Sequence, residues 1–100
     1  LLYRIDEYWE MQGEMADIPL KQKPSDYFKQ QCFISMDVDE TLVKNVIDTM
    51  GDDNIVISTD YPHIDCRWPH ALDSFLSIPL SDESRRKILW DNCVRLYGVN

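Results

Sequence analysis

The stretch from Ile55 to His63, IVISTDYPH, constrains the fold of this chain more than any other. Three β-branched apolar residues, Ile55 to Ile57, follow one another without a polar residue between them, and the carboxylate of Asp60 comes shortly after. Such a run is typical of a parallel strand that is covered on both faces. Because ligands gather at the carboxyl ends of such strands, we expect the chemistry of this chain at Asp60 and His63.

A second strand is expected from Cys32 to Met36, followed by a helix from Asp39 to Met50. The apolar residues of this helix fall on one stripe, Asp37 or Asp39 is suited to cap its start, and Gly51 suits a left-handed residue after its end. A strand, a helix and a strand within roughly 30 residues form a βαβ unit with parallel strands. The sequence therefore predicts an α/β architecture.

Helical patterns flank this unit on both sides. We expect a helix from Leu1 to about Met15, then a connector marked by Pro19 and Pro24 that ends in the turn-like segment PSDYF. After the second strand, we expect a long loop that holds one short helix at about Pro69 to Leu76. Trp68 can line the mouth of a substrate site or anchor this loop, and the large area that a tryptophan buries favours anchoring.

The last helix is expected to begin at a Ser81 cap and to end before Gly98. The run from Arg85 to Lys87 is expected on its solvated face, and Trp90 among its core positions. Its buried stripe is predicted to comprise Ile88, Leu89, Cys93, Leu96 and Tyr97.

Composition excludes several classes of partner. A net charge of −8 over 100 residues opposes binding to nucleic acid or to an anionic membrane, and no run approaches the roughly 20 apolar residues of a membrane span. The three cysteines, Cys32, Cys66 and Cys93, do not form a disulfide pattern, so we expect a reducing, cytoplasmic location.

Two parallel strands that are apolar on both faces cannot satisfy their edges by themselves. Either further strands lie on another part of the polypeptide, or copies of the chain pair edge to edge, which would make a homo-oligomer. The chain also begins within a helical pattern, without a methionine at Leu1, so we expect it to be cut from something larger.

Two segments, STDYPHIDCRWPHAL and LSDESRRKILWDNCVRLYGV, resemble the C-terminal end of the amidohydrolase-related metal-dependent hydrolases. This family includes aminocarboxymuconate-semialdehyde decarboxylase. The segment PSDYFKQQCFIS, from Pro24, is similar to the approach to the family's seventh strand. The combination of a DYPH strand end, a Trp-Pro and this terminal helix carries the resemblance, which is weakest before Pro24. One departure is Thr59, where the family more often has serine.

The resemblance implies that residues 1–100 are the C-terminal segment of a single (β/α)8 TIM-barrel domain, with about two parallel strands and three main helices. In that family the aspartate that falls on Asp60 ligates a divalent metal, here expected to be zinc, or takes a proton from metal-bound water. The substrate is expected to be a small carboxylate-bearing or cyclic molecule that is hydrolysed or decarboxylated. The family's other ligands are earlier histidines, and because this chain has only His63 and His70, the isolated chain is expected to be inactive.

Other interpretations stay open. Asp60 can instead cap its loop, and His63 can contact substrate, orient a metal-bound group or bond only its own loop. Asp60, His63, Asp65, Cys66 and His70 offer five metal ligands in eleven residues, but their spacing matches no zinc pattern, which favours a chance cluster. A non-catalytic, self-associating interaction module and a phosphoacceptor domain are the alternatives from other functional classes.

Overall fold

The computed structural model describes residues 1–13 and 19–99, which fall into two units. The helical unit, Leu1–Cys32, consists of α1 (Leu2–Gln12) and α2 (Pro24–Gln31). The expectation of a turn at PSDYF is wrong, because these residues begin α2. Proline is favoured in the first helical turn, where its missing N–H has no partner to lose. The expected end of the first helix at Met15 lies outside the described residues.

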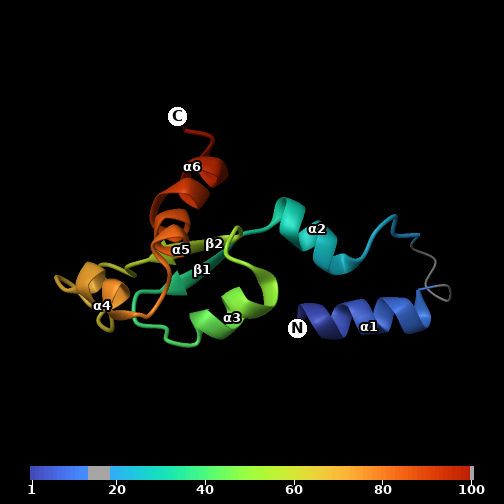
Figure 1. The fold of residues 1–100 in the computed structure, drawn as a ribbon, viewed down its shortest axis with the longest axis horizontal. Coiled ribbons are helices and arrows are strands. Elements are labelled where there is room, and N and C mark those ends of the chain that lie inside the picture. Colours follow the sequence, from blue (N-terminus) through green and yellow to red (C-terminus); the bar gives the residue numbers. More distant parts are fainter. Residues whose placement is uncertain (14–18, 100) are drawn as a thin grey trace. The chain divides into compact units, whose positions relative to one another are not determined.

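The sheet unit, Phe33–Asn100, contains two parallel strands, β1 (Ile34–Asp37) and β2 (Ile55–Ser58), joined through α3 (Val43–Met50) (Figure 1). Ile34 pairs with Ile55, and Asp37 pairs with Ser58. The predicted βαβ unit is therefore confirmed. Both strands end at the same edge, as the parallel register requires.

Helical segments follow β2 to the end of the chain: α4 (Ala71–Ser77), α5 (Asp82–Arg86), the π-helix η1 (Lys87–Asp91) and α6 (Asn92–Tyr97). The last three, α5, η1 and α6, run on continuously and together form the final column, drawn from orange to red in Figure 1. The predicted cap is confirmed, because the N–H of Ser84 donates to Ser81 Oγ at 3.1 Å. Gly98 ends the column in the left-handed conformation, at φ 64°.

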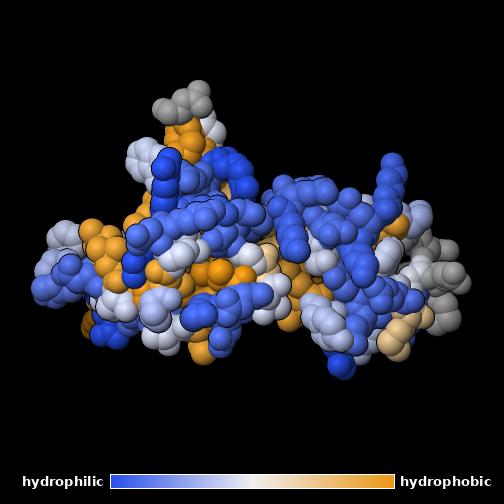
Figure 2. All heavy atoms as spheres, viewed as in Figure 1, coloured by the Kyte–Doolittle hydropathy of each residue, from blue (hydrophilic) through white to orange (hydrophobic). Residues whose placement is uncertain are grey.

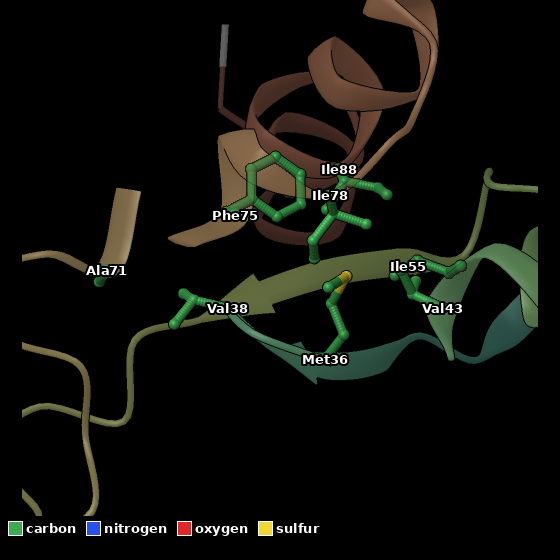
Figure 3. Packing of buried hydrophobic residues seen from close by; sticks show 8 residues of the cluster. All are labelled: Met36, Val38, Val43, Ile55, Ala71, Phe75, Ile78 and Ile88. Atoms are coloured by element: carbon green, nitrogen blue, oxygen red, sulfur yellow. The ribbon is translucent and has the colours of Figure 1, made fainter. Parts of the chain in front are cut away.

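The hydrophobic core lies between the strands and the helices that follow them (Figure 3). Phe75, Ile78 and Ile88 approach β2 from the helical side, and Met36 and Ile55 come from the strands. Burial on both faces is incomplete in the described chain, because Ser35 and Asp37 of β1 are exposed. The buried apolar residues are Met36, Val38, Val43, Ile55, Ala71, Phe75, Ile78 and Ile88.

The start of α3 differs from the expectation. The helix begins at Val43, and its N-cap residue, Leu42, makes no side-chain cap. Neither Asp37 nor Asp39 caps a helix, because the Asp39 carboxylate binds Arg67, 28 residues further along the chain. The side chain that the local pattern predicted to cap the helix forms a long-range ion pair instead.

The π-helix changes which side chains of the final column are buried. A π-turn inserts an extra residue and so shifts the buried face of the helix beyond it. Ile88 is buried and Leu89 half-buried as predicted, but Leu96 and Tyr97 are exposed at 41% and 74%, and Trp90 is exposed as well. These three expectations of burial are wrong.

Asn92 is buried on the shifted face instead of an apolar residue. Its side-chain Nδ2 donates to the carbonyl oxygens of Asp52 and Ile55, both at 2.7 Å. A buried amide is stable only when it is hydrogen-bonded, so these two bonds fix the final column against the start of β2.

The basic run is also not a simple solvated face. Lys87 Nζ lies 2.9 Å from the carboxylates of both Asp52 and Asp53. Arg85 Nη2 donates to the carbonyl oxygens of Leu76 and Ile78, at 3.2 and 3.0 Å. Both side chains therefore hold loops against the final column.

We predict that the Asp52 contacts make the stability of the chain depend on pH. Burial by itself raises the pKa of Asp52, but the hydrogen bonds from Ser84 Oγ and Lys87 Nζ outweigh it and lower the pKa below its usual value. A lowered pKa stabilises the fold above the unfolded-state value, about 3.9, and this stabilisation is lost as the pH falls through the folded-state value.

Asp52→Asn should therefore lower the free energy of unfolding at pH 7 by about 1–3 kcal/mol, measured by urea denaturation. The difference from the wild type should persist from about pH 5 to 8 and shrink below about pH 4. Asp53→Asn is the matched control, because that carboxylate contacts the same Lys87 but is mostly exposed. Equal losses in both variants, or a difference that does not depend on pH, would contradict this prediction.

The face drawn in Figure 2 is largely hydrophilic, with hydrophobic side chains reaching the surface in places. Within the described ranges, no helix is long and apolar enough to cross a membrane. Among the described residues, Cys32, Cys66 and Cys93 form no disulfide with one another.

Candidate functional site

A small cleft lies at the carboxyl ends of both strands, where Asp37 and Ser58 pair in the sheet. Its volume is about 40 Å³, far below the roughly 300 Å³ at which pockets for small organic ligands begin. The cleft can therefore form only one wall of a substrate site. Its lining residues are Asp37, Val38, Asp39, Ser58, Thr59, Asp60, Asp65, Cys66 and Arg67.

Asp60 lines this cleft in an unusual backbone conformation. Its φ of 54° lies in the left-handed region, which residues other than glycine enter rarely and which recurs at functional sites. The N–H of Asp60 donates to Ser58 Oγ at 3.2 Å, and its carbonyl accepts the N–H of His63 at 2.9 Å. These bonds fix the turn that carries Asp60 beyond the strand end.

The charges around the cleft are mostly negative. Asp37, Asp39, Asp60 and Asp65 all line it, against a single arginine, Arg67. Arg67 Nε and Nη2 both lie 2.6 Å from Asp39 Oδ2, which joins the loops that follow the two strands. In the part of the chain that the structure describes, the Asp60 carboxylate has no ion-pair partner and remains available to an external cation.

The second predicted site residue, His63, lies just outside the cleft. Its backbone forms the turn after Asp60, and its side chain is exposed and does not line the cleft. His70 is also exposed, with Nδ1 3.7 Å from a carboxylate oxygen of Asp73. Across residues 1–13 and 19–99, no three His, Cys, Asp or Glu side chains meet in a group that could hold a metal.

The donor chemistry nevertheless fits a divalent metal at this position. Asp60 offers a carboxylate oxygen, a ligand that both zinc and manganese accept, in a cleft rich in negative charge. Its missing cation partner agrees with a role as a ligand. The remaining ligands would have to come from outside the described residues.

Tyr61 and Trp68, which adjoin residues of the cleft in the chain, form an exposed aromatic pair. Their ring centroids lie 5.1 Å apart with the rings tilted by 53°, an arrangement typical of interacting aromatics. Trp68 is 66% exposed, so the expectation that it anchors the loop by burial is wrong. Each ring is the chain neighbour of a residue that lines the cleft, Asp60 or Arg67.

The sequence pattern had not singled out Asp37, Asp39 and Arg67 as site residues. The two aspartates follow the first strand directly, and parallel strands end at one edge, so their proximity to Asp60 could have been predicted. Arg67 gave no such signal, because its place depends on the path of an irregular loop.

Comparison with known proteins identifies the family of the chain. Residues 4–99 match the family model described as Amidohydrolase. The chain is 31% identical over 104 residues to gamma-resorcylate decarboxylase of Polaromonas sp. strain JS666, a match that covers 99% of the chain. The chain spans about 30% of the length of that relative.

Solved structures show the same fold. The structure of 5-carboxyvanillate decarboxylase from Sphingomonas paucimobilis superimposes with a TM-score of 0.78 at 22% identity, covering 99% of this chain and 30% of that one. Dihydroxybenzoic acid decarboxylase from Polaromonas sp. JS666, solved with manganese and the inhibitor 2-nitroresorcinol, has a TM-score of 0.69 at 31% identity over 97% of this chain and 29% of its own. The described chain is therefore an α/β structure that matches part of these TIM-barrel decarboxylases.

Proposed function

Because this chain belongs to the amidohydrolase family, we propose that it forms the C-terminal segment of a (β/α)8 barrel enzyme that decarboxylates a small aromatic carboxylic acid. The observation that carries the proposal is the position of Asp60, left-handed, without a cation partner among the described residues and at the carboxyl ends of two parallel strands. Active sites of such barrels lie at this edge. The similar proteins named above are decarboxylases, which favours decarboxylation over hydrolysis.

In this reaction the bond between the ring and the carboxyl carbon breaks. The carboxyl group leaves as CO₂, and the electron pair of the broken bond stays on the ring carbon. A proton must then be added to the ring carbon. We assign the transfer of this proton to Asp60, whose carboxylate is exposed to the cleft: it takes up a proton from solvent water, gives that proton to the ring carbon and returns to the carboxylate. A carboxyl group positioned in this way speeds proton transfer by about 10²- to 10⁴-fold.

A divalent metal bound at Asp60 would supply positive charge that polarises the oxygen atoms of the substrate. The family resemblance led us to expect zinc, whereas a related structure holds manganese, and elemental analysis of the purified protein distinguishes the two. Asp60 is the residue of this chain that would hold the metal.

The isolated chain should not turn over an aromatic acid, because its cleft is small and its described residues hold no group of three metal ligands. Activity is best tested in a chimaera in which residues 4–99 replace the matched segment of the Polaromonas decarboxylase. We expect CO₂ release from 2,6-dihydroxybenzoate by the chimaera and none from the chain alone. Equal turnover by the isolated chain would contradict the proposal that the site needs residues from outside this chain.

His63 is assigned a positioning role in this reaction. The hydrogen bond from its N–H to the Asp60 carbonyl holds it next to the site, and its ring has no partner in the described structure. We predict that His63→Gln lowers kcat/KM of the chimaera about tenfold and changes its pH profile. His70→Gln, which alters the other exposed histidine, should leave kcat/KM and the pH profile unchanged. An equal effect of the two substitutions would contradict the positioning role of His63.

A further inference from the structure

We propose that Arg67 binds the carboxylate of an aromatic acid at the cleft beside Asp60, an inference that rests on the proposed function for the nature of the substrate. Arg67 is the basic residue among the described residues that line the cleft, and four aspartates line it as well. Such a cleft repels an anion unless a cation faces it. The planar guanidinium is the side chain best matched to a carboxylate.

Arg67 already binds a carboxylate in this structure. Its Nε and Nη2 atoms both lie 2.6 Å from one oxygen, Asp39 Oδ2. Two donors on a single oxygen do not use the side-by-side geometry that a carboxylate with two free oxygens permits. We therefore interpret Asp39 as an internal stand-in for the carboxylate of the ligand.

The pair is also easy to exchange. The side chains of Arg67 and Asp39 are 60% and 42% exposed, and ion pairs at such exposure contribute at most about 1 kcal/mol. A ligand carboxylate can therefore displace Asp39 at little cost. Asp39 would then act as a competitor that weakens the binding of any anion to Arg67.

Preference for an aromatic acid comes from the exposed pair of rings formed by Tyr61 and Trp68. Trp68 follows Arg67 directly in the chain, and Tyr61 follows Asp60. Exposed aromatic faces attract other aromatic rings beyond simple burial of area. We therefore expect a benzoate-type ligand to use Arg67 for its carboxylate and this ring pair, on the chain neighbours of Asp60 and Arg67, for its own ring, whereas acetate can use only the cation.

The test uses the 100-residue chain itself, labelled with nitrogen-15 and free of metal. The side-chain Nε–Hε resonances of arginine are followed by NMR during titration with benzoate, acetate or uncharged phenol. We expect benzoate to shift the Arg67 signal in a saturable way, acetate to bind more weakly and phenol to leave the signal in place. Because Arg67→Met removes this signal, binding to the variants is followed by the backbone amide resonances of the residues that line the cleft. Arg67→Met should abolish benzoate binding, and Arg86→Met should not, because Arg86 is an exposed arginine paired with Asp91 outside the cleft.

Asp39→Asn separates binding from a structural role. If Asp39 is a competitor, its removal should tighten benzoate binding by up to about fivefold, the equivalent of about 1 kcal/mol. If the ion pair only holds the loops in place, Asp39→Asn should weaken binding as Arg67→Met does, which would overturn the inference. Unchanged benzoate binding in Arg67→Met, or equal binding of acetate and benzoate, would overturn it as well.

The test of benzoate binding at Arg67 and the test of the proposed function can fail independently of each other. Benzoate binding to the isolated chain requires no turnover, whereas the proposed function is tested by CO₂ release from the chimaera. Turnover without benzoate binding at Arg67 would overturn only the role of Arg67. Benzoate binding at Arg67 without turnover by the chimaera would overturn only the decarboxylase assignment.

Discussion

Asp60→Asn should reduce decarboxylation by the chimaera on the order of 10³-fold, because one substitution removes both a metal ligand and the carboxyl group assigned to proton transfer. The amide is nearly the same size as the carboxylate. It can keep the turn after β2, since the hydrogen bonds there are made by the backbone of Asp60. Initial rates of CO₂ release from 2,6-dihydroxybenzoate measure the loss, and circular dichroism checks the fold.

Asp65→Asn is the matched control for this substitution. Asp65 lines the same cleft and carries the same charge, but it does not follow a strand end. We expect a change of less than about tenfold. If the two variants lose activity equally, the cleft needs negative charge in general and Asp60 has no special role. If Asp60→Asn remains active, the assignment fails.

Phe75→Ala should be the most destabilising single substitution in the sheet unit, costing about 3–5 kcal/mol. The ring is fully buried, at 0% exposure, and it packs on the helical side of β2 together with Ile78 and Ile88 (Figure 3). Small domains have only about 5–15 kcal/mol of stability in total. We therefore expect a detectably unfolded fraction at room temperature, measured by urea denaturation with tryptophan fluorescence.

Leu76→Ala controls for the loss of apolar surface from the same helix. Leu76 is the next residue of α4 and is 45% exposed, so its truncation should cost less than about 1 kcal/mol. Equal losses for Phe75→Ala and Leu76→Ala would mean that α4 does not pack on the sheet as the structure shows.

The strands were predictable because their signal is local. An apolar β-branched run, Ile55 to Ile57, marks β2, which is observed at Ile55–Ser58. The other strand, expected from Cys32 to Met36, is observed at Ile34–Asp37. The start of α3 was not predictable, because Asp39 binds Arg67 through the tertiary fold. Local pattern has no access to such a competing partner.

The prediction of which residues of the final column are buried was wrong for a different reason. Its predicted stripe assumed 3.6 residues per turn throughout, and the π-helix Lys87–Asp91 breaks that period. The buried residues Ser84, Ile88 and Asn92 follow one another at intervals of four. Nothing in the apolar pattern indicated that a polar side chain, Asn92, would be bonded to the carbonyl oxygens near the start of β2.

Some residues of the candidate site were likewise predictable from local pattern, and others were not. Asp60 followed from the strand in front of it, since the carboxyl end of a parallel strand is where ligands bind. Arg67 and the aromatic pair depend on how the loop after β2 folds back, which the sequence pattern does not specify. A residue that directly follows a strand was thus predictable, and residues further along the long loop were not.

The most direct test of the account is the metal content of the purified chimaera and of its Asp60→Ala and Asp65→Ala variants, measured by elemental mass spectrometry. The account predicts about one zinc or manganese per chain in the chimaera, loss of that metal in Asp60→Ala and its retention in Asp65→Ala. Equal metal content in all three proteins would contradict the claim that Asp60 is a metal ligand.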